Sequence, residues 1–218
     1  MISVEDLTFG YALDDEPVLT RLDASFATGS TTALVGRSGS GKSTMLYLIG
    51  MMLRPWSGSI RIGNTEVVGL PDWARAEIRA RRTGFVFQDA LLDPARSILD
   101  NVMEGALYDA RTSPSQARRL ALQLLEDFGV EIDPYRRPGQ VSGGQAQRVA
   151  LARAFVGDPA IVLADEPTGN LDADTADVVW QALTEQARNG AVVIVATHDT
   201  SRAAACDHMI RIGHGAPG

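Results

Sequence analysis

Four short apolar runs, rich in branched residues, recur along the chain of 218 residues. They cover residues 31–35, 84–88, 161–165 and 191–197, and their length and composition predict buried strands. Between the second and third runs the pattern becomes helical, most clearly at residues 113–129, where Ser113 and Pro114 begin a helix and Gly129 ends it. Strands that alternate with helices predict an α/β fold with a mainly parallel sheet.

The apolar content of 45% and the length suit one globular domain with a sizeable core. We interpret residues 90–155 as a helical subdomain inserted into an α/β core of about residues 1–89 and 156–218. The apolar positions of the clearest helix in this region fall on one face. They are Ala117, Leu120, Ala121, Leu124, Leu125 and Phe128.

The net charge of −7 argues against broad binding to nucleic acid or to an anionic membrane, because both need a dominant basic surface. Cys206 is the single cysteine, and no leader-like segment opens the chain, so we expect a reducing, cytosolic location. No apolar run approaches the length of a membrane span. Any work at a membrane therefore requires a partner.

Lys42 is the only lysine of the chain, in which lysine and arginine together number 20. It lies in GRSGSGKSTM, where Gly36, Gly41, Lys42 and Ser43 match the phosphate-loop pattern between a predicted strand and a helix. Glycines let backbone N–H groups surround phosphate oxygens, and the helix terminus adds positive charge. Lysine reaches the terminal phosphates as a point charge, a place that the longer, forked arginine fits badly.

Two carboxylates follow the third apolar run, at Asp165 and Glu166. Taken alone, such a pair more often marks a loop or a helix start. At the carboxyl end of a buried strand, in a chain with a phosphate loop, it predicts a catalytic site. Ser43 and Asp165 are candidate ligands of Mg²⁺, as in P-loop NTPases, and Glu166 is the candidate base that activates water.

A second glycine-rich helix start occurs in VSGGQAQRVALARAF. Ser142 and Gln145 have the spacing of a capping box, which by itself is a structural feature. Gly143 and Gly144 weaken a first turn, so capping does not account for them. They expose the helix terminus as a second anion site, which can serve a phosphate held by another copy of the chain.

These motifs together resemble the nucleotide-binding subunits of ATP-binding cassette transporters along essentially the whole chain. GRSGSGKST resembles the Walker A segment, FVFQ the Q-loop, VSGGQ the signature, LADE the Walker B strand, GNLD the D-loop and ATHD the switch. The resemblance implies a RecA-like P-loop NTPase core with an N-terminal antiparallel β portion. It also implies an ATPase activity with ATP and Mg²⁺ as ligands.

The resemblance implies a role for each matching position. Tyr11 would stack on adenine, although a surface or core tyrosine is the alternative for a lone aromatic. Gln88 would contact Mg²⁺ and the attacking water. His198 would contact the γ-phosphate and hold Glu166. The residues that would surround the phosphates are Gly36, Arg37, Ser38, Gly39, Ser40, Gly41, Lys42, Ser43 and Thr44. The residues that would act across a dimer interface are Ser142, Gly143, Gly144, Gln145 and Asp172. His208 and His214 have no such context and are expected on the surface.

Such sharing implies a head-to-tail homodimer in the ATP-bound state, working on a separate integral membrane permease subunit at the cytoplasmic face of the inner membrane. Within the family, TGNLD and FVFQ are most like the ATPases of macrolide-export, lipoprotein-releasing and cell-division complexes.

Two other classes stay open. A DNA-repair ATPase shares these motifs but inserts a coiled coil or a zinc module, and neither heptads nor paired cysteines occur between Lys42 and Ser142. Its best support is the helical face of Arg75, Arg79 and Arg82, which we interpret as a solvated face. A regulatory clamp with slow turnover is the second class.

Overall fold

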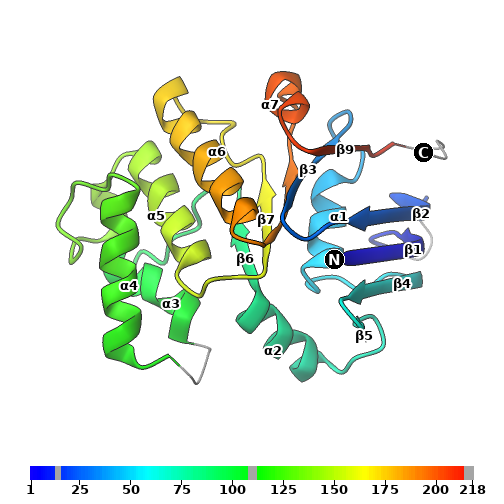
Figure 1. The fold of residues 1–218 in the computed structure, drawn as a ribbon, viewed down its shortest axis with the longest axis horizontal. Helices are drawn as coiled ribbons and strands as arrows, with labels where there is room; N and C mark the ends of the chain where they lie inside the picture. The colour runs from blue at the N-terminus through cyan, green and yellow to red at the C-terminus, as the bar shows by residue number, and fades with distance from the viewer. Residues whose placement is uncertain (13–15, 108–111, 214–218) are drawn as a thin grey trace.

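The structure is a computed structural model that describes residues 1–12, 16–107 and 112–213. It contains two sheets and a group of helices (Figure 1). The first sheet is antiparallel in the order β2-β1-β4-β5. Its strands are β1 (Ile2–Phe9), β2 (Leu19–Phe26), β4 (Ser57–Ile62) and β5 (Thr65–Glu66).

The second sheet has the order β6-β7-β8-β3-β9, and all of its pairings are parallel. Its strands are β3 (Ser30–Val35), β6 (Thr83–Val86), β7 (Ile161–Asp165), β8 (Val192–Ala196) and β9 (His208–Arg211). The four strands predicted from apolar runs are therefore confirmed, as is the α/β class. β6 ends two residues earlier than predicted, so Phe87 and Gln88 lie beyond the strand.

The helices belong to two layers on opposite faces of the parallel sheet, and a further group lies beyond them (Figure 1). They are α1 (Lys42–Ile49), α2 (Asp72–Arg82), α3 (Ile98–Leu107), α4 (Pro114–Asp127), α5 (Gly143–Phe155), α6 (Ala173–Arg188) and α7 (Thr200–Ala204), with a 3-10 turn at Pro138–Gln140. No helix among the described residues is both long enough and apolar enough to cross a bilayer.

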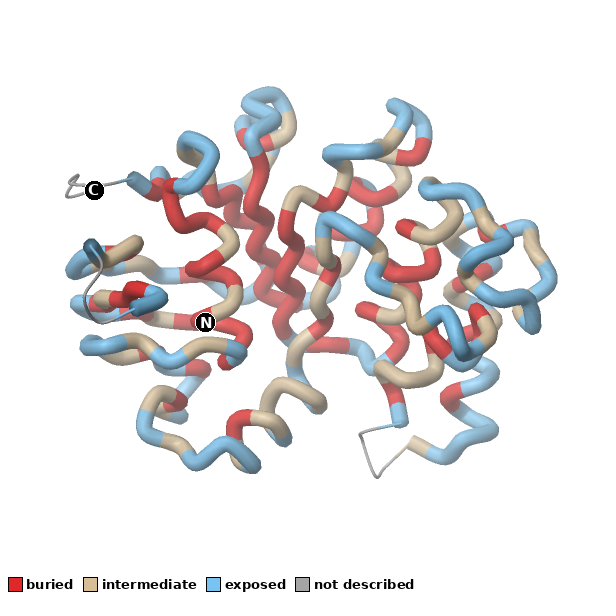
Figure 2. The backbone as a smooth tube through the Cα atoms, turned by 180° about the vertical axis from the view of Figure 1, so that it is seen from behind, coloured by how far each residue is buried: buried red, intermediate tan, exposed pale blue. Residues whose placement is uncertain are grey.

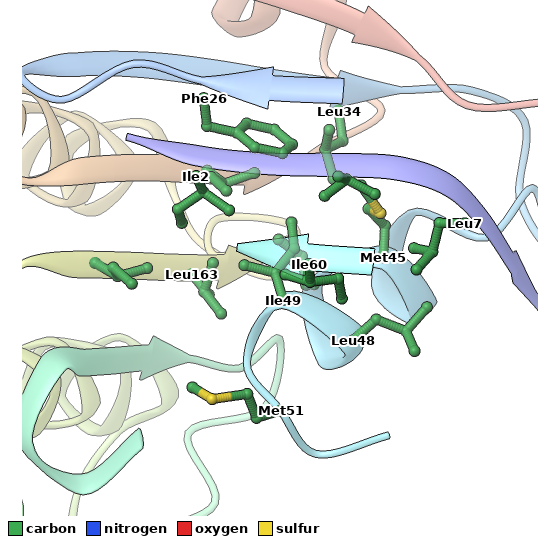
Figure 3. Close-up of a cluster of buried hydrophobic side chains, with 14 of the residues drawn as sticks. Ile2, Leu7, Phe26, Leu34, Met45, Leu48, Ile49, Met51, Ile60 and Leu163 are labelled. Atoms are coloured by element: carbon green, nitrogen blue, oxygen red, sulfur yellow. The ribbon is translucent and has the colours of Figure 1, made fainter. Parts of the chain in front are cut away.

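Side chains of β7 alternate between two apolar cores because successive residues of a strand point to opposite faces. Ile161 and Leu163 join the core that contains α1 and the antiparallel sheet (Figure 3). Val162 and Ala164 join the core that contains α5 and α6. Figure 2 shows the resulting band of buried backbone through the middle of the molecule. The central strands β7 and β8 are covered on both faces, which explains why they read as continuous apolar runs.

Helix α4 begins as predicted, because the Ser113 hydroxyl accepts a hydrogen bond from the N–H of Gln116 at 3.3 Å. It ends before Gly129, which has a φ of 63°. The expected apolar face is wrong at Leu120, which is 41% exposed. Ala117, Ala121 and Leu125 of α4 pack against α3 and one face of α5. Leu151, on another face of α5, packs against the sheet. The division into core and subdomain remains a proposal.

The interpretation of the arginines of α2 as a solvated face is wrong for Arg75, which is only 6% exposed. Its guanidinium donates to the carbonyls of Met51 at 2.7 Å and Leu53 at 2.5 Å, just after α1. Arg79 donates to the same Met51 carbonyl at 3.2 Å. Burial lowers the pKa of Arg75. These arginines hold α2 against the end of α1, and only Arg82 is exposed as expected.

Candidate functional site

The loop between β3 and α1 has a backbone that only glycine adopts easily. Gly39 and Gly41 have φ values of 76° and 98°. A Cβ atom at Gly36 would lie 2.3 Å from the carbonyl oxygen of Ile212 and 2.5 Å from the Ser40 hydroxyl oxygen. Arg37, Ser38 and Gly39 are exposed, whereas Ser40 and Gly41 are buried. The loop therefore presents its outer residues to solvent from a closely packed base.

Lys42 directs its ammonium back into this loop. Its Nζ atom donates to the carbonyls of Gly36 at 3.1 Å and Arg37 at 3.3 Å, and the residue is 8% exposed. No side chain caps the start of α1, and the buried Ser40 hydroxyl lacks a hydrogen-bond partner among the described residues. Positive charge and unused donors converge here, which is what an anionic phosphate group requires.

Asp165 lies at the end of β7, directly opposite the start of α1. The Ser43 hydroxyl donates to its Oδ1 atom at 2.9 Å, and the Tyr47 hydroxyl donates to its Oδ2 atom at 3.1 Å. Burial raises the pKa of Asp165, and the two hydroxyls oppose that rise. Burial and the nearby carboxylate raise the pKa of Tyr47 to about 12. The sequence reasoning missed Tyr47, although it is four residues after Ser43 and so shares its helical face.

Glu166 and His198 meet because β7 and β8 are paired in parallel, with Asp165 opposite Ala196. The Glu166 backbone N–H donates to the Ala196 carbonyl at 2.9 Å. Glu166 itself has a φ of 45°, in the left-handed region, so the extended backbone of β7 ends before it. The Glu166 Oε2 atom is 2.8 Å from the His198 Nδ1 atom and accepts from the His198 N–H at 3.3 Å. The carboxylate is 16% exposed and the imidazole 74%, so the histidine side chain remains available for a ligand.

The two remaining predicted side chains of the nucleotide site are Tyr11 and Gln88. Tyr11 is 64% exposed, and its hydroxyl is 3.0 Å from the Thr44 hydroxyl oxygen, so the ring stands beside the phosphate loop. It packs edge-on against Phe9. Gln88 is exposed, and no hydrogen bond within the described part of the chain joins it to Asp165 or Glu166. His208 is exposed, whereas His214 lies outside the described residues.

The predicted capping box is confirmed at the start of α5. Ser142 Oγ accepts from the Gln145 N–H at 3.3 Å, and Gln145 Oε1 accepts from the Ser142 N–H at 3.1 Å. A Cβ atom at Gly144 would lie 3.5 Å from Thr175 Oγ1, an ordinary contact distance. Because packing leaves that space, the glycine is not explained by crowding.

Asp172 caps α6 beside this segment, accepting from the Thr175 N–H at 2.9 Å and from its hydroxyl at 3.0 Å. These bonds lower the pKa of Asp172. A Cβ atom at Gly144 would also lie 3.9 Å from Asp172 Oδ2, so the signature segment and Asp172 form one surface. Since α5 and α6 pack on the face of the parallel sheet opposite α1, this surface is separate from the phosphate loop of the same chain.

A phosphate loop, a serine–aspartate pair and a carboxylate aligned by histidine define an ATP-hydrolysing protein of the P-loop class. A family model described as "ABC transporter" matches residues 19–169. The chain belongs to this family and is an ATP-binding, ATP-hydrolysing subunit of an ABC transporter.

Relatives and solved structures agree with this assignment. The chain is 41% identical to the lipoprotein-releasing system ATP-binding protein LolD of Geobacter metallireducens, over 99% of this chain and 96% of that protein. It is 42% identical to LolD of Hyphomonas neptunium, over 96% and 92% of the two chains. A dimeric structure of the ATP-binding cassette MJ0796 bound to ADP and phosphate superposes with a TM-score of 0.90 at 34% identity, covering 99% of this chain and 95% of the other.

Proposed function

We propose that this chain is the ATPase subunit of a lipoprotein-releasing complex and drives a separate integral membrane subunit. The observation that carries the proposal is its similarity, over almost its full length, to lipoprotein-releasing ATPases. Of the three groups that the sequence resembles, this similarity favours lipoprotein release. The chain would then work as a peripheral protein at the cytoplasmic face of the inner membrane.

The oxygen ligands at the end of β7 fit Mg²⁺. Ser43 Oγ and Asp165 Oδ1 lie 2.9 Å apart, and both are hard oxygen donors of the kind that Mg²⁺ prefers. A buried carboxylate with a raised pKa is stabilised by a neighbouring cation. Ser43 and Asp165 would hold the ion, with Gln88 approaching it from beyond β6. When bound, the ion supplies positive charge to the phosphate oxygens.

The remaining site residues of the same chain have separate roles in hydrolysis. Lys42 and the backbone N–H groups of the loop bind and orient the phosphates, and Tyr11 stacks on the base. The Glu166 carboxylate accepts a hydrogen bond from the attacking water and takes up its proton. His198 holds that carboxylate through its 2.8 Å contact and leaves its other ring nitrogen for the γ-phosphate.

The second half of the site is supplied by another copy of the chain. Ser142, Gly143, Gly144 and Gln145 form an anion site on the face opposite α1, so a partner's signature segment would close over ATP bound to this phosphate loop. Asp172 lies in the same surface and would cross the same interface. Dimeric structures of the similar cassette MJ0796 support this homodimer. Each ATP would join two subunits, and its hydrolysis would release them.

Mixing two inactive variants tests the shared site. Lys42→Ala removes the phosphate contact and Ser142→Arg blocks the signature segment, so each protein alone should lose ATPase activity. A heterodimer of the two contains one complete site, and the mixture should therefore regain up to about half of the wild-type rate per dimer. Absence of recovery in a mixture shown to form heterodimers would contradict the shared site.

The membrane partner is tested with Glu166→Gln, which should bind ATP without hydrolysing it. We would purify this variant from detergent-solubilised membranes with ATP and Mg²⁺, identify the proteins that accompany it, and use Lys42→Ala as the matched control. The proposal expects a membrane subunit that is retained by Glu166→Gln, is absent with Lys42→Ala, and stimulates the wild-type ATPase. Retention of soluble proteins or nucleic acid alone would overturn the partner assignment and leave the ATPase site intact.

A further inference from the structure

Gln147 is a buried polar side chain in α5, two residues after Gln145, where the signature segment ends. It is 3% exposed, and its Nε2 atom donates to the carbonyl of Phe87 at 3.0 Å and to that of Pro167 at 3.1 Å. A glutamine amide has two hydrogens, and this geometry uses both. The side chain is thus fully committed as a donor to two backbone segments.

The two acceptors adjoin the two proposed catalytic side chains. Phe87 immediately precedes Gln88, and Pro167 immediately follows Glu166. β6 ends at Val86 and β7 ends at Asp165, so both carbonyls lie beyond the parallel strand pairing that could have satisfied them. Gln147 replaces that pairing with a bridge between segments that are 60 and 20 residues away from it in the sequence.

Arg153 holds the other side of the Gln88 segment from the same helix. Its guanidinium donates to the carbonyls of Ala90 at 2.7 Å and Leu91 at 2.8 Å. Side chains of helix α5 therefore donate hydrogen bonds to the backbone both before and after Gln88. Of these two side chains, Gln147 also reaches the Glu166 segment.

We infer that Gln147 is a positioning residue for ATP hydrolysis, which sets the distance between Gln88 and Glu166 and links it to the signature helix. This inference rests on the roles proposed for those two side chains. A displacement of α5, whose first turn is the proposed contact to the partner's nucleotide, is transmitted through one side chain to both of them. Gln147 itself touches neither nucleotide nor water.

The test is Gln147→Met, which keeps an unbranched side chain of similar length and removes both donors. We expect kcat to fall by about 10- to 100-fold, since displacements of about 1 Å in a catalytic group have that effect. The affinity for ATP, measured in the non-hydrolysing Glu166→Gln background, should change by less than about 3-fold, because the phosphate loop is untouched. Gln123→Met is the matched control. Gln123 is exposed on α4, where its side chain donates to Asp127 of the same helix, and the kcat of this variant should equal that of the wild type.

A double-mutant cycle with Gln88→Ala separates positioning from general weakening of the fold. If Gln147 acts through Gln88, the rate loss caused by Gln147→Met should be clearly smaller in the Gln88→Ala background than in the wild type. Fully additive losses, or an ATP affinity that falls in step with kcat, would overturn the inference.

Gln147→Asn covers the case in which the methionine variant does not fold. The shorter amide stays polar but cannot reach both carbonyls, so kcat should fall by several-fold with normal ATP affinity. A folded Gln147→Asn protein with wild-type kcat would also overturn the inference. If Glu166→Gln still hydrolyses ATP at the wild-type rate, the role proposed for Glu166 as the base has failed instead, so that failure is distinguishable from a failure of this inference.

Discussion

The hydroxyl of Tyr47 should tune the binding of Mg²⁺ through Asp165, and Tyr47→Phe removes that hydroxyl alone. The lost hydrogen bond is 3.1 Å long and ends on a carboxylate. Bonds to charged groups contribute about 1.5–3 kcal/mol. Asp165 keeps its bond to Ser43, so we expect the low end of that range, about 1.5 kcal/mol of unfolding free energy.

The effect on the metal should be of similar size. Removing a partner that orients a ligand typically weakens metal binding by about 10- to 100-fold, and we expect about 10-fold here because one of two orienting bonds remains. The assay is a Mg²⁺ titration of the ATP-dependent thermal stabilisation of Glu166→Gln protein, with and without Tyr47→Phe. Tyr135→Phe is the control, since Tyr135 is 60% exposed and its hydroxyl accepts a hydrogen bond from Arg118, far from Asp165 in the sequence.

The same substitution should change the pH dependence. The Tyr47 hydroxyl opposes the burial that raises the pKa of Asp165, so its removal should raise that pKa further. Protons then compete with Mg²⁺, and the loss of affinity should grow as the pH falls. In metal-free protein the folded state retains this proton longer than the unfolded state, so the unfolding free energy should fall as the pH rises through the raised pKa. An unchanged Mg²⁺ titration in Tyr47→Phe would refute this reasoning.

Three further substitutions have definite expected outcomes. Arg75→Met should lower the unfolding free energy by about 3 kcal/mol, measured by urea denaturation, because two carbonyls lose a buried charged donor; a loss below about 1 kcal/mol would contradict the buried role of Arg75. Gly36→Ala should weaken ATP binding by about 100-fold or more in equilibrium titrations, since its Cβ would collide with the Ile212 carbonyl; normal affinity would contradict the close packing of the loop. His198→Ala should lower kcat by about 100-fold with little change in ATP affinity; equal losses of both would indicate a binding role instead.

The motifs with local causes were predictable from the sequence. The phosphate loop, the carboxylates after β7 and the capping box of α5 each depend on residues within about ten positions of one another. Backbone geometry over that span depends on glycine conformation, capping and strand propensity, which the sequence states directly. The location of β7 and the start of α5 followed for the same reason.

The faces of the parallel sheet were not predictable. In the central strands β7 and β8 both faces are buried, so their residues before Asp165 are all apolar and the alternation that marks an inner and an outer face is absent. The sequence therefore did not reveal that α1 lies on one face and α5 on the other. That arrangement is what separates the phosphate loop from the signature segment of the same chain.

The chain itself thus determined which chemical groups are present and the local backbone that presents each of them. Tertiary structure decided which groups meet: Tyr47 and Asp165 are 118 positions apart, and Gln147 and Phe87 are 60 apart. It also buried Arg75, whose spacing had indicated a solvated face. The physical reason is that such contacts depend on the order of strands in the sheet and on the packing of helices against it. Periodicity within a short segment contains no information about either.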